Sequence, residues 1–173
     1  RKESSAASDV YKRQVPFLEL DDGTVISESI SICRYLEEIY PNPALFGTTA
    51  ETRAIIDMWL RRFELDGFVP MLHAVRNHLE NFKGRVIPGT RTDLPQVPEM
   101  VARGIEMGKM FLERVEPHMA ENEFVAGSRF SVADITAFFT IKLTTPLKID
   151  INASYPGVAA WMDRMSKREA FNI

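Results

Sequence analysis

Residues 15–40 read VPFLELDDGTVISESISICRYLEEIY, and they hold the clearest local pattern in the chain. A short apolar run, 17–20, precedes Asp21-Asp22-Gly23, and a second run begins at Val25. An Asp-Gly pair between two apolar runs predicts a β-hairpin with a two-residue type I′ turn, in which both central residues have positive φ. After the second strand comes Ser29, whose side chain suits the N-cap of a helix.

That helix is predicted to be amphipathic and to end before Pro41, because residues that precede proline avoid the helical region. At 100° per residue one broad arc is apolar, and it comprises Ile30, Ile32, Cys33, Tyr35, Leu36, Ile39 and Tyr40. We expect this arc to lie on the small sheet, with Cys33 as a buried structural thiol rather than a nucleophile.

Composition places the chain among ordinary globular proteins: 173 residues, 45% hydrophobic and 26% charged, with a formal net charge of −3. The acidic balance argues against nucleic acid as a partner, because nucleic-acid binding needs a basic face. One cysteine excludes an internal disulfide framework and suits a reducing compartment. No apolar run approaches membrane-spanning length, and no metal-ligand spacing is present, so we expect neither a membrane span nor a metal.

The rest of the chain is predicted to be helical. Apolar residues recur at spacings of three and four along 50–82, where Gly67 and Pro70 interrupt the pattern, and again along 99–120. Arg61 and Arg62 are expected on a solvated face, with a salt bridge between subunits as the minor alternative. A final helical pattern begins after Pro156.

The best-defined helix start lies at Ser131. Ser131 and Asp134 form a Ser-x-x-Asp capping box, in which each side chain can bond the other residue's backbone amide. We assign this pair a structural role only.

Two of these segments carry a family resemblance. Val15-Pro16, Glu28-Ser29 and ICRYLEEIYP (32–41), in this order, resemble the second half of the thioredoxin-like domain of a cytosolic, bacterial-type glutathione transferase. FVAGSRFSVADITAF (124–138) resembles the capping segment of that family's helical domain. The resemblance extends from Val15 to about the C-terminus. It implies an α+β, mostly helical fold: a partial thioredoxin-like unit, hairpin plus helix, followed by an all-helical domain.

The resemblance also implies a glutathione site. In the family the X-Pro bond that matches Val15-Pro16 is cis, so that the Val15 backbone can pair with the cysteinyl part of glutathione as an added strand. Ser29, at a helix N-terminus, would hold the γ-glutamyl carboxylate, and Glu28 would hold the amino group or the strand–helix turn. The structural alternatives are that Pro16 is an ordinary edge-strand proline and that Ser29 only caps its helix.

The implied activity is transfer of glutathione, as its thiolate, to a small apolar electrophile, as in detoxification. A cytoplasmic homodimer with no cofactor besides the glutathione substrate is expected. In the family a Ser, Tyr or Cys near the first strand activates the thiol, and no counterpart of that strand is seen here. No catalytic residue is therefore assigned, and little activity is expected of this truncated chain. The alternative is a non-catalytic interaction module of the same architecture.

The predicted organisation has four parts. Residues 1–14 are polar, aperiodic and unlike the family, and we interpret them as a non-native tail. Residues 15–41 are the second half of the thioredoxin-like domain, 42–49 the linker and 50–173 the helical domain.

Overall fold

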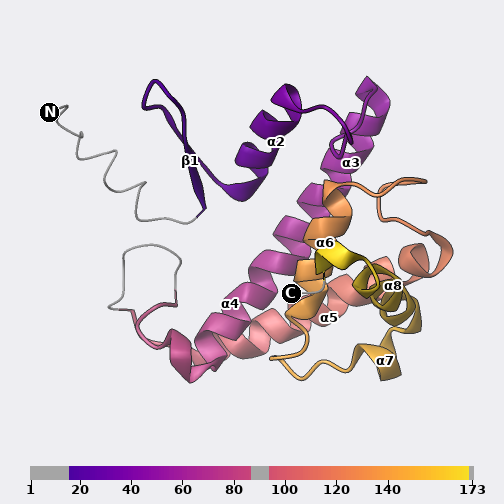
Figure 1. The fold of residues 1–173 in the computed structure, drawn as a ribbon. Coiled ribbons are helices and arrows are strands. Elements are labelled where there is room, and N and C mark those ends of the chain that lie inside the picture. The colour runs from indigo at the N-terminus through magenta and orange to yellow at the C-terminus, as the bar shows by residue number, and fades with distance from the viewer. Residues whose placement is uncertain (1–15, 87–93, 172–173) are drawn as a thin grey trace, which may run out of the picture.

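The computed structural model describes residues 16–86 and 94–171. It begins with an antiparallel hairpin of β1 (Phe17–Glu19) and β2 (Val25–Ser27), followed by helix α2 (Ser29–Ile39) (Figure 1). In this ladder Leu18 lies opposite Ile26, and α2 packs on the same hairpin. The predicted tail at 1–14 lies outside the described residues.

The turn between the strands differs from the predicted type I′ turn. The Leu20 amide donates to the Thr24 carbonyl at 2.9 Å, and the Gly23 amide donates to the Leu20 carbonyl at 2.9 Å. Gly23 has a φ of 85°, whereas neither Asp21 nor Asp22 has a positive φ. The loop is therefore one residue longer than predicted, with only its last residue left-handed. Asp22 favours this geometry by accepting the Thr24 amide at 2.8 Å, a bond that lowers the pKa of its carboxyl.

Helix α2 is amphipathic as predicted, but no residue of α2 is fully buried. Tyr40, just after it, is 70% exposed and Ile39 is 48% exposed. The prediction of a buried Cys33 is wrong, because the thiol is exposed. The reason is that the described hairpin, with three residues in each strand, is too small to cover the whole apolar arc.

The helical part begins with one long run. Helix α3 (Ala50–Arg62) passes through a π-helical segment (Phe63–Phe68) into α4 (Val69–His78) (Figure 1). The Val69 amide donates to the Glu64 carbonyl, five residues back. The interruption predicted at Gly67 and Pro70 thus takes the form of a widened turn within a continuous helix.

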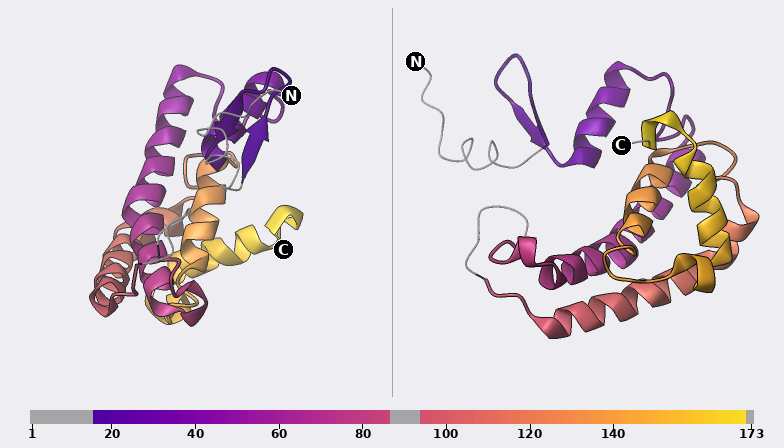
Figure 2. Two further views of the ribbon diagram at one scale, coloured as in Figure 1. Left: turned by 90° about the vertical axis from the view of Figure 1, so that its left-hand side faces the viewer. Right: turned by 60° about the horizontal axis from the view of Figure 1, so that its bottom comes forward.

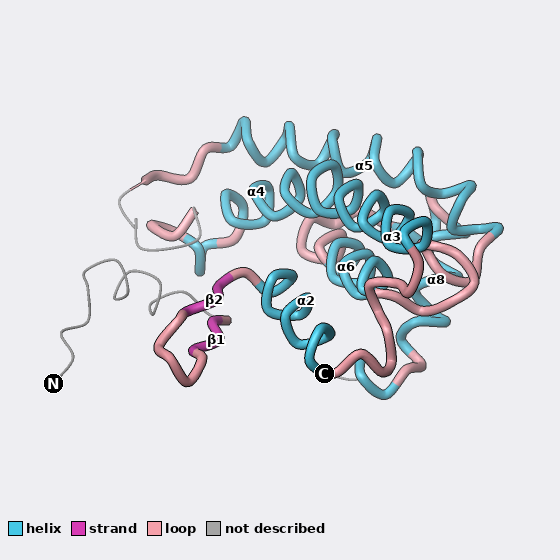
Figure 3. The backbone as a smooth tube through the Cα atoms, turned by 90° about the horizontal axis from the view of Figure 1, so that it is seen from above, coloured by secondary structure: helices cyan, strands magenta, loops and turns pink. Residues whose placement is uncertain are grey.

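The remaining helices pack along this run. Helix α5 (Pro98–Glu121) lies against α4, and α6 (Val132–Lys142) contacts α3 and the π-helical segment. The short α7 (Ile151–Ser154) contacts α8 (Pro156–Ser166), and α8 packs against α5. Figures 2 and 3 show the hairpin and α2 as a separate small lobe at one side of this bundle. The predicted fold class, a partial α/β unit followed by helices, is confirmed. The domain boundaries at 41/42 and 49/50 stay a prediction.

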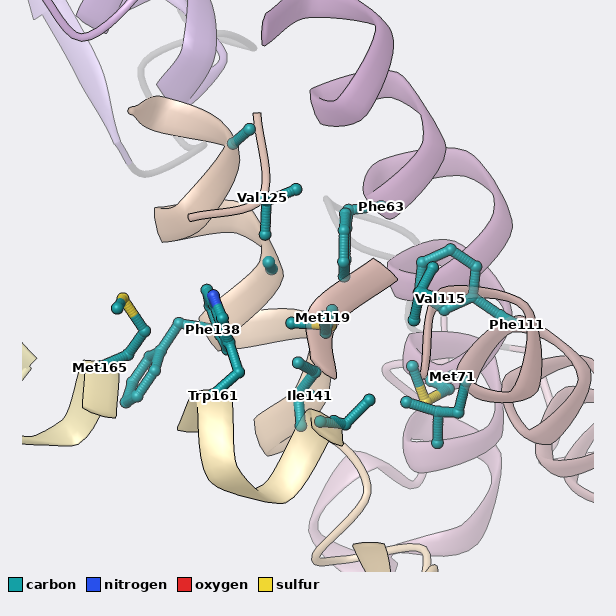
Figure 4. Close-up of a cluster of buried hydrophobic side chains, with 14 of the residues drawn as sticks. Phe63, Met71, Phe111, Val115, Met119, Val125, Phe138, Ile141, Trp161 and Met165 are labelled. Atoms are coloured by element: carbon teal, nitrogen blue, oxygen red, sulfur yellow. The ribbon is translucent and has the colours of Figure 1, made fainter. Parts of the chain in front are cut away.

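The hydrophobic core belongs to the helical bundle. Trp161 of α8, Phe63 of the π-helical segment and Ile141 of α6 have no exposed surface, and Met119 of α5 has 1% (Figure 4). Side chains from these four elements therefore share one interior, and their burial supplies the main stabilisation of the fold.

The start of α6 lies at the edge of this core. The Ser131 amide donates to Oδ2 of Asp134 at 2.8 Å, and the Val125 amide donates to Oδ1 at 2.8 Å. The capping box of Ser131 and Asp134 is formed, and both residues are buried. The carboxylate thus ties the turn before α6 to the helix itself.

None of the described helices combines the length and the apolar character needed to cross a membrane.

Candidate functional site

The site is built where the hairpin gives way to α2. Strand β2 ends at Ser27, α2 begins at Ser29, and Glu28 lies between them as the N-cap residue. The prediction of Ser29 as the N-cap is therefore wrong by one position: Ser29 is the first helical residue. The first intrahelical bond runs from the Ile32 amide to the Glu28 carbonyl at 3.0 Å. The amides before Ile32 point out of the helix end, where an anion can accept them.

Glu28 has an unusual backbone, with φ 69° and ψ 120°. A side chain with a Cβ avoids this region, and holding it there costs roughly 1 to 3 kcal/mol. Such strain persists where the surrounding structure demands it, and it gathers at ligand-binding positions. Here it lets the chain turn sharply from strand to helix with both Glu28 and Ser29 exposed.

A cleft of ≈ 380 Å³ opens at this helix end, between α2 and α3. The opposite wall includes Asp57 and Arg61 of α3 and Glu64 of the π-helical segment that continues it, at spacings of four and three along one face of this helical run. The residues that line the cleft are Glu28, Ser29, Ile30, Ser31, Arg34, Asp57, Leu60, Arg61 and Glu64. The helix end and the α3 face thus enclose one polar site.

Two ion pairs organise the charges of this cleft. Arg34 of α2 pairs with Asp57 of α3, and Arg61 Nη1 lies 2.6 Å from Glu64 Oε2. None of these four residues was predicted as a site residue from the sequence. Arg61 was predicted on a solvated face; it is exposed, as predicted, and also lines the cleft. No pattern in the sequence marks these residues, because the packing of α3 and the π-helical segment beside α2 brings them to the cleft.

The other predicted glutathione contacts are Val15 and Pro16. Val15 lies outside the described residues, so its peptide bond to Pro16 is not described either. Pro16 is exposed and directly precedes β1. Because Phe17 pairs with Ser27, one step further along the ladder places Pro16 beside Glu28. The register therefore brings Pro16 and the Glu28-Ser29 pair to the same end of the hairpin.

The helix-capping residues lie elsewhere. Ser131 and Asp134 are buried at the start of α6 and do not line the cleft. Within 16–86 and 94–171, no cluster of three or more His, Cys, Asp or Glu side chains is arranged to hold a metal ion.

Family models match both parts of the chain. The model described as "Glutathione S-transferase, N-terminal domain" matches residues 1–44, and "Glutathione S-transferase, C-terminal domain" matches residues 99–169. The order of the two matches is the order of the small α/β lobe and the helical bundle described above.

Solved structures agree with these matches. A class Gtt2 glutathione S-transferase from Vibrio parahaemolyticus is 31% identical, with a TM-score of 0.77 over 99% of this chain and 79% of that chain. A glutathione S-transferase domain-containing protein from Marinobacter aquaeolei is 33% identical, with a TM-score of 0.75 over 92% of this chain and 75% of that chain.

A hairpin and helix of thioredoxin-like type, joined to a helical bundle across a polar cleft, define a two-domain transferase architecture. The chain belongs to the glutathione S-transferase family. Among curated relatives, glutathione S-transferase 2 of Saccharomyces cerevisiae is 29% identical over 158 residues. That alignment covers 91% of this chain and 65% of the yeast protein, so the chain spans about two thirds of the relative's length.

Proposed function

We propose that the cleft at the N-terminus of α2 binds glutathione. The observation that carries the proposal is the exposed, strained Glu28 followed by Ser29 at a helix end that opens into this cleft. The γ-glutamyl carboxylate would accept the Ser29 hydroxyl and the first amides of α2, where the helix dipole favours negative charge. The γ-glutamyl ammonium would pair with the Glu28 carboxylate.

The cysteinyl part of glutathione would pair with the Val15 backbone, next to Pro16. Pro16 supports this arrangement, because the hairpin register puts it at the same end as Glu28. One extended tripeptide could then contact both segments.

The proposed reaction is a transfer. The glutathione sulfur, as a thiolate, attacks an electrophilic carbon of a small apolar molecule, a carbon–sulfur bond forms, and the leaving group departs with its electron pair. A hydrogen bond that stabilises the thiolate would lower the thiol pKa and keep the nucleophile present at neutral pH. No described residue is assigned that role. Glutathione is the substrate, no further cofactor is proposed, and the proposed compartment is the cytoplasm.

Replacing Ser29 with alanine is expected to weaken glutathione binding by roughly 10- to 100-fold, the loss of a hydrogen bond to a charged group. Alanine has a higher helix propensity than serine, so α2 itself is not weakened. Isothermal titration of the chain with reduced glutathione measures the Kd. Ser154→Ala, an exposed serine of α7, is the control and should leave the Kd unchanged. An unaltered Kd in Ser29→Ala would show that the Ser29 side chain does not contribute to glutathione binding.

We also propose that the chain forms a homodimer through the apolar groove between α4 and α5. This groove has a volume of ≈ 420 Å³, and the exposed apolar side chains of Val69, Met100 and Met107 form part of its wall. It is lined by Val69, Pro70, His73, Glu99, Met100, Arg103, Gly104 and Met107. Exposed apolar side chains that gather in one groove are typical of a protein–protein contact.

Met107→Glu places a charge in this groove and is expected to convert the dimer to a monomer of 19.7 kDa. A buried, unpaired carboxylate at the interface would cost several kcal/mol, enough to dissociate a typical dimer. Size-exclusion chromatography with light scattering measures the mass. Ala160→Glu, on the exposed face of α8, carries the same charge outside the groove and should stay dimeric. A dimer that survives Met107→Glu would exclude this groove as the interface.

A further inference from the structure

Helix α2 is held against the bundle mainly by polar contacts. None of its residues is fully buried, although Ile30 packs against the edge of the core. Since apolar packing alone does not fix the helix, specific hydrogen bonds must set its direction. That direction matters because the N-terminus of α2 forms one wall of the cleft.

Glu37 makes several of these contacts through a single carboxylate. Its Oε2 accepts the Leu45 amide at 2.6 Å, and the Phe46 amide lies 3.0 Å from Oε1 and 3.1 Å from Oε2. A half-buried carboxylate that receives two successive amides is held in both position and orientation. Glu37 therefore fastens the C-terminal half of α2 to the segment that follows it.

That segment is itself fixed to the bundle. The Leu45 carbonyl accepts the Val132 amide at 3.1 Å, at the start of α6. Phe46 is buried in the core, and the Arg34 guanidinium lies 4.8 Å from the centre of its ring. A series of contacts thus connects α6, residues 45 and 46, and Glu37. Arg34, which lines the cleft, contacts Phe46 in the same region.

We infer that Glu37 is a positioning residue for glutathione: it holds α2 at the tilt that brings Ser29 to the ligand. The inference rests on the proposed function of the cleft. Ser29 and Glu37 are eight residues apart, about 12 Å along the helix at a rise of 1.5 Å per residue. A tilt of about 10° at Glu37 moves Ser29 by about 2 Å, beyond the range over which a hydrogen bond persists.

Glu37→Gln tests this inference, because glutamine keeps one acceptor oxygen and nearly the same shape. The Kd for glutathione is expected to rise roughly tenfold, since a displacement of about 1 Å at a binding group can cost that much or more. Glu38→Gln is the matched control. Glu38 adjoins Glu37 on α2, is exposed, and should leave the Kd unchanged.

A double-mutant cycle separates positioning from a general loss of stability. If Glu37 acts largely through Ser29, Glu37→Gln should raise the Kd by a clearly smaller factor when Ser29 is alanine than when Ser29 is present, although each single change weakens binding. The shifts in the thermal midpoint of unfolding caused by Glu37→Gln and Ser29→Ala should add, because the two substitutions remove separate contacts. Additive effects on the Kd would overturn the inference.

Glu37→Asp keeps the test decisive if the glutamine variant does not fold. It retains the charge but shortens the side chain by one methylene, so α2 must shift by about 1.5 Å or lose the bonds to Leu45 and Phe46. Weaker glutathione binding by a folded Glu37→Asp chain supports the inference, and an unchanged Kd overturns it. Failure of the unsubstituted chain to bind glutathione would instead overturn the proposed function, and this inference with it.

Discussion

Replacing Asp134 with alanine is expected to lower the free energy of unfolding by about 3 kcal/mol. The Asp134 carboxylate accepts the amides of Val125 and Ser131, each at 2.8 Å, and the Ser131 hydroxyl at 3.0 Å. Burial raises the pKa of this carboxyl above its ordinary value, and the two amide bonds oppose that rise. Alanine would leave both amides buried without an acceptor, at about 1 to 3 kcal/mol each. Alanine also removes the desolvation cost of burying a carboxylate, which offsets part of that loss.

Denaturant unfolding followed by circular dichroism measures this change. Ser131→Ala is the natural comparison, because it removes the hydroxyl but keeps the amide that bonds Asp134. That variant is expected to lose only about 1 kcal/mol. Equal free energies of unfolding for the two variants would show that Asp134 contributes no more than an ordinary cap. The hydrogen bond from the Val125 amide would then add no stability.

Gly104→Ala is expected to destabilise the chain by about 2 kcal/mol, even though alanine favours a helix by about 1 kcal/mol. At Gly104 helix α5 crosses α4 closely, and a Cβ would lie 2.5 Å from the Pro70 carbonyl oxygen and 2.8 Å from the Ala74 Cβ. Neither atom can move without moving the α4 backbone. The two helices would have to separate, at the expense of the core below them.

Gly108→Ala is the matched control on the same face of α5, one turn further on. A Cβ there would lie 2.7 Å from Cγ and 3.0 Å from Sδ of Met71, a flexible side chain that can change rotamer. The gain in helix propensity should nearly cancel this adjustment, so the stability should stay within about 0.5 kcal/mol. Thermal melts of both variants decide the matter, and equal losses would show that backbone contact is not what makes Gly104 necessary.

Most of the fold could be predicted because its elements carry local signals. The hairpin follows from Asp22-Gly23 between apolar runs, and the helix start at Ser131 follows from its capping box. The turn type could not be predicted, since the Asp22 bond to Thr24 selects a longer loop with the same residues. Exposure of Cys33 could not be predicted either, because a helical pattern shows which face is apolar but not how much of it a neighbour covers.

The candidate site was likewise only partly predictable from the sequence. Glu28 and Ser29 could be found because they lie together in the sequence at a strand–helix junction. Asp57, Arg61 and Glu64 could not be found, because they reach the cleft only through the packing of α3 and the π-helical segment beside α2. Glu37 was hidden for a related reason: its partners are backbone amides, which leave no trace in the identity of residues 45 and 46.

The exposed thiol of Cys33 has a practical consequence. It is the single cysteine of the 173 residues, and it lies on α2 one helical turn beyond Ser29. A maleimide fluorophore would therefore attach at one defined point without any engineering of the sequence. Its emission would report the local environment of α2 directly, giving an optical readout of ligand binding and helix movement in the same sample.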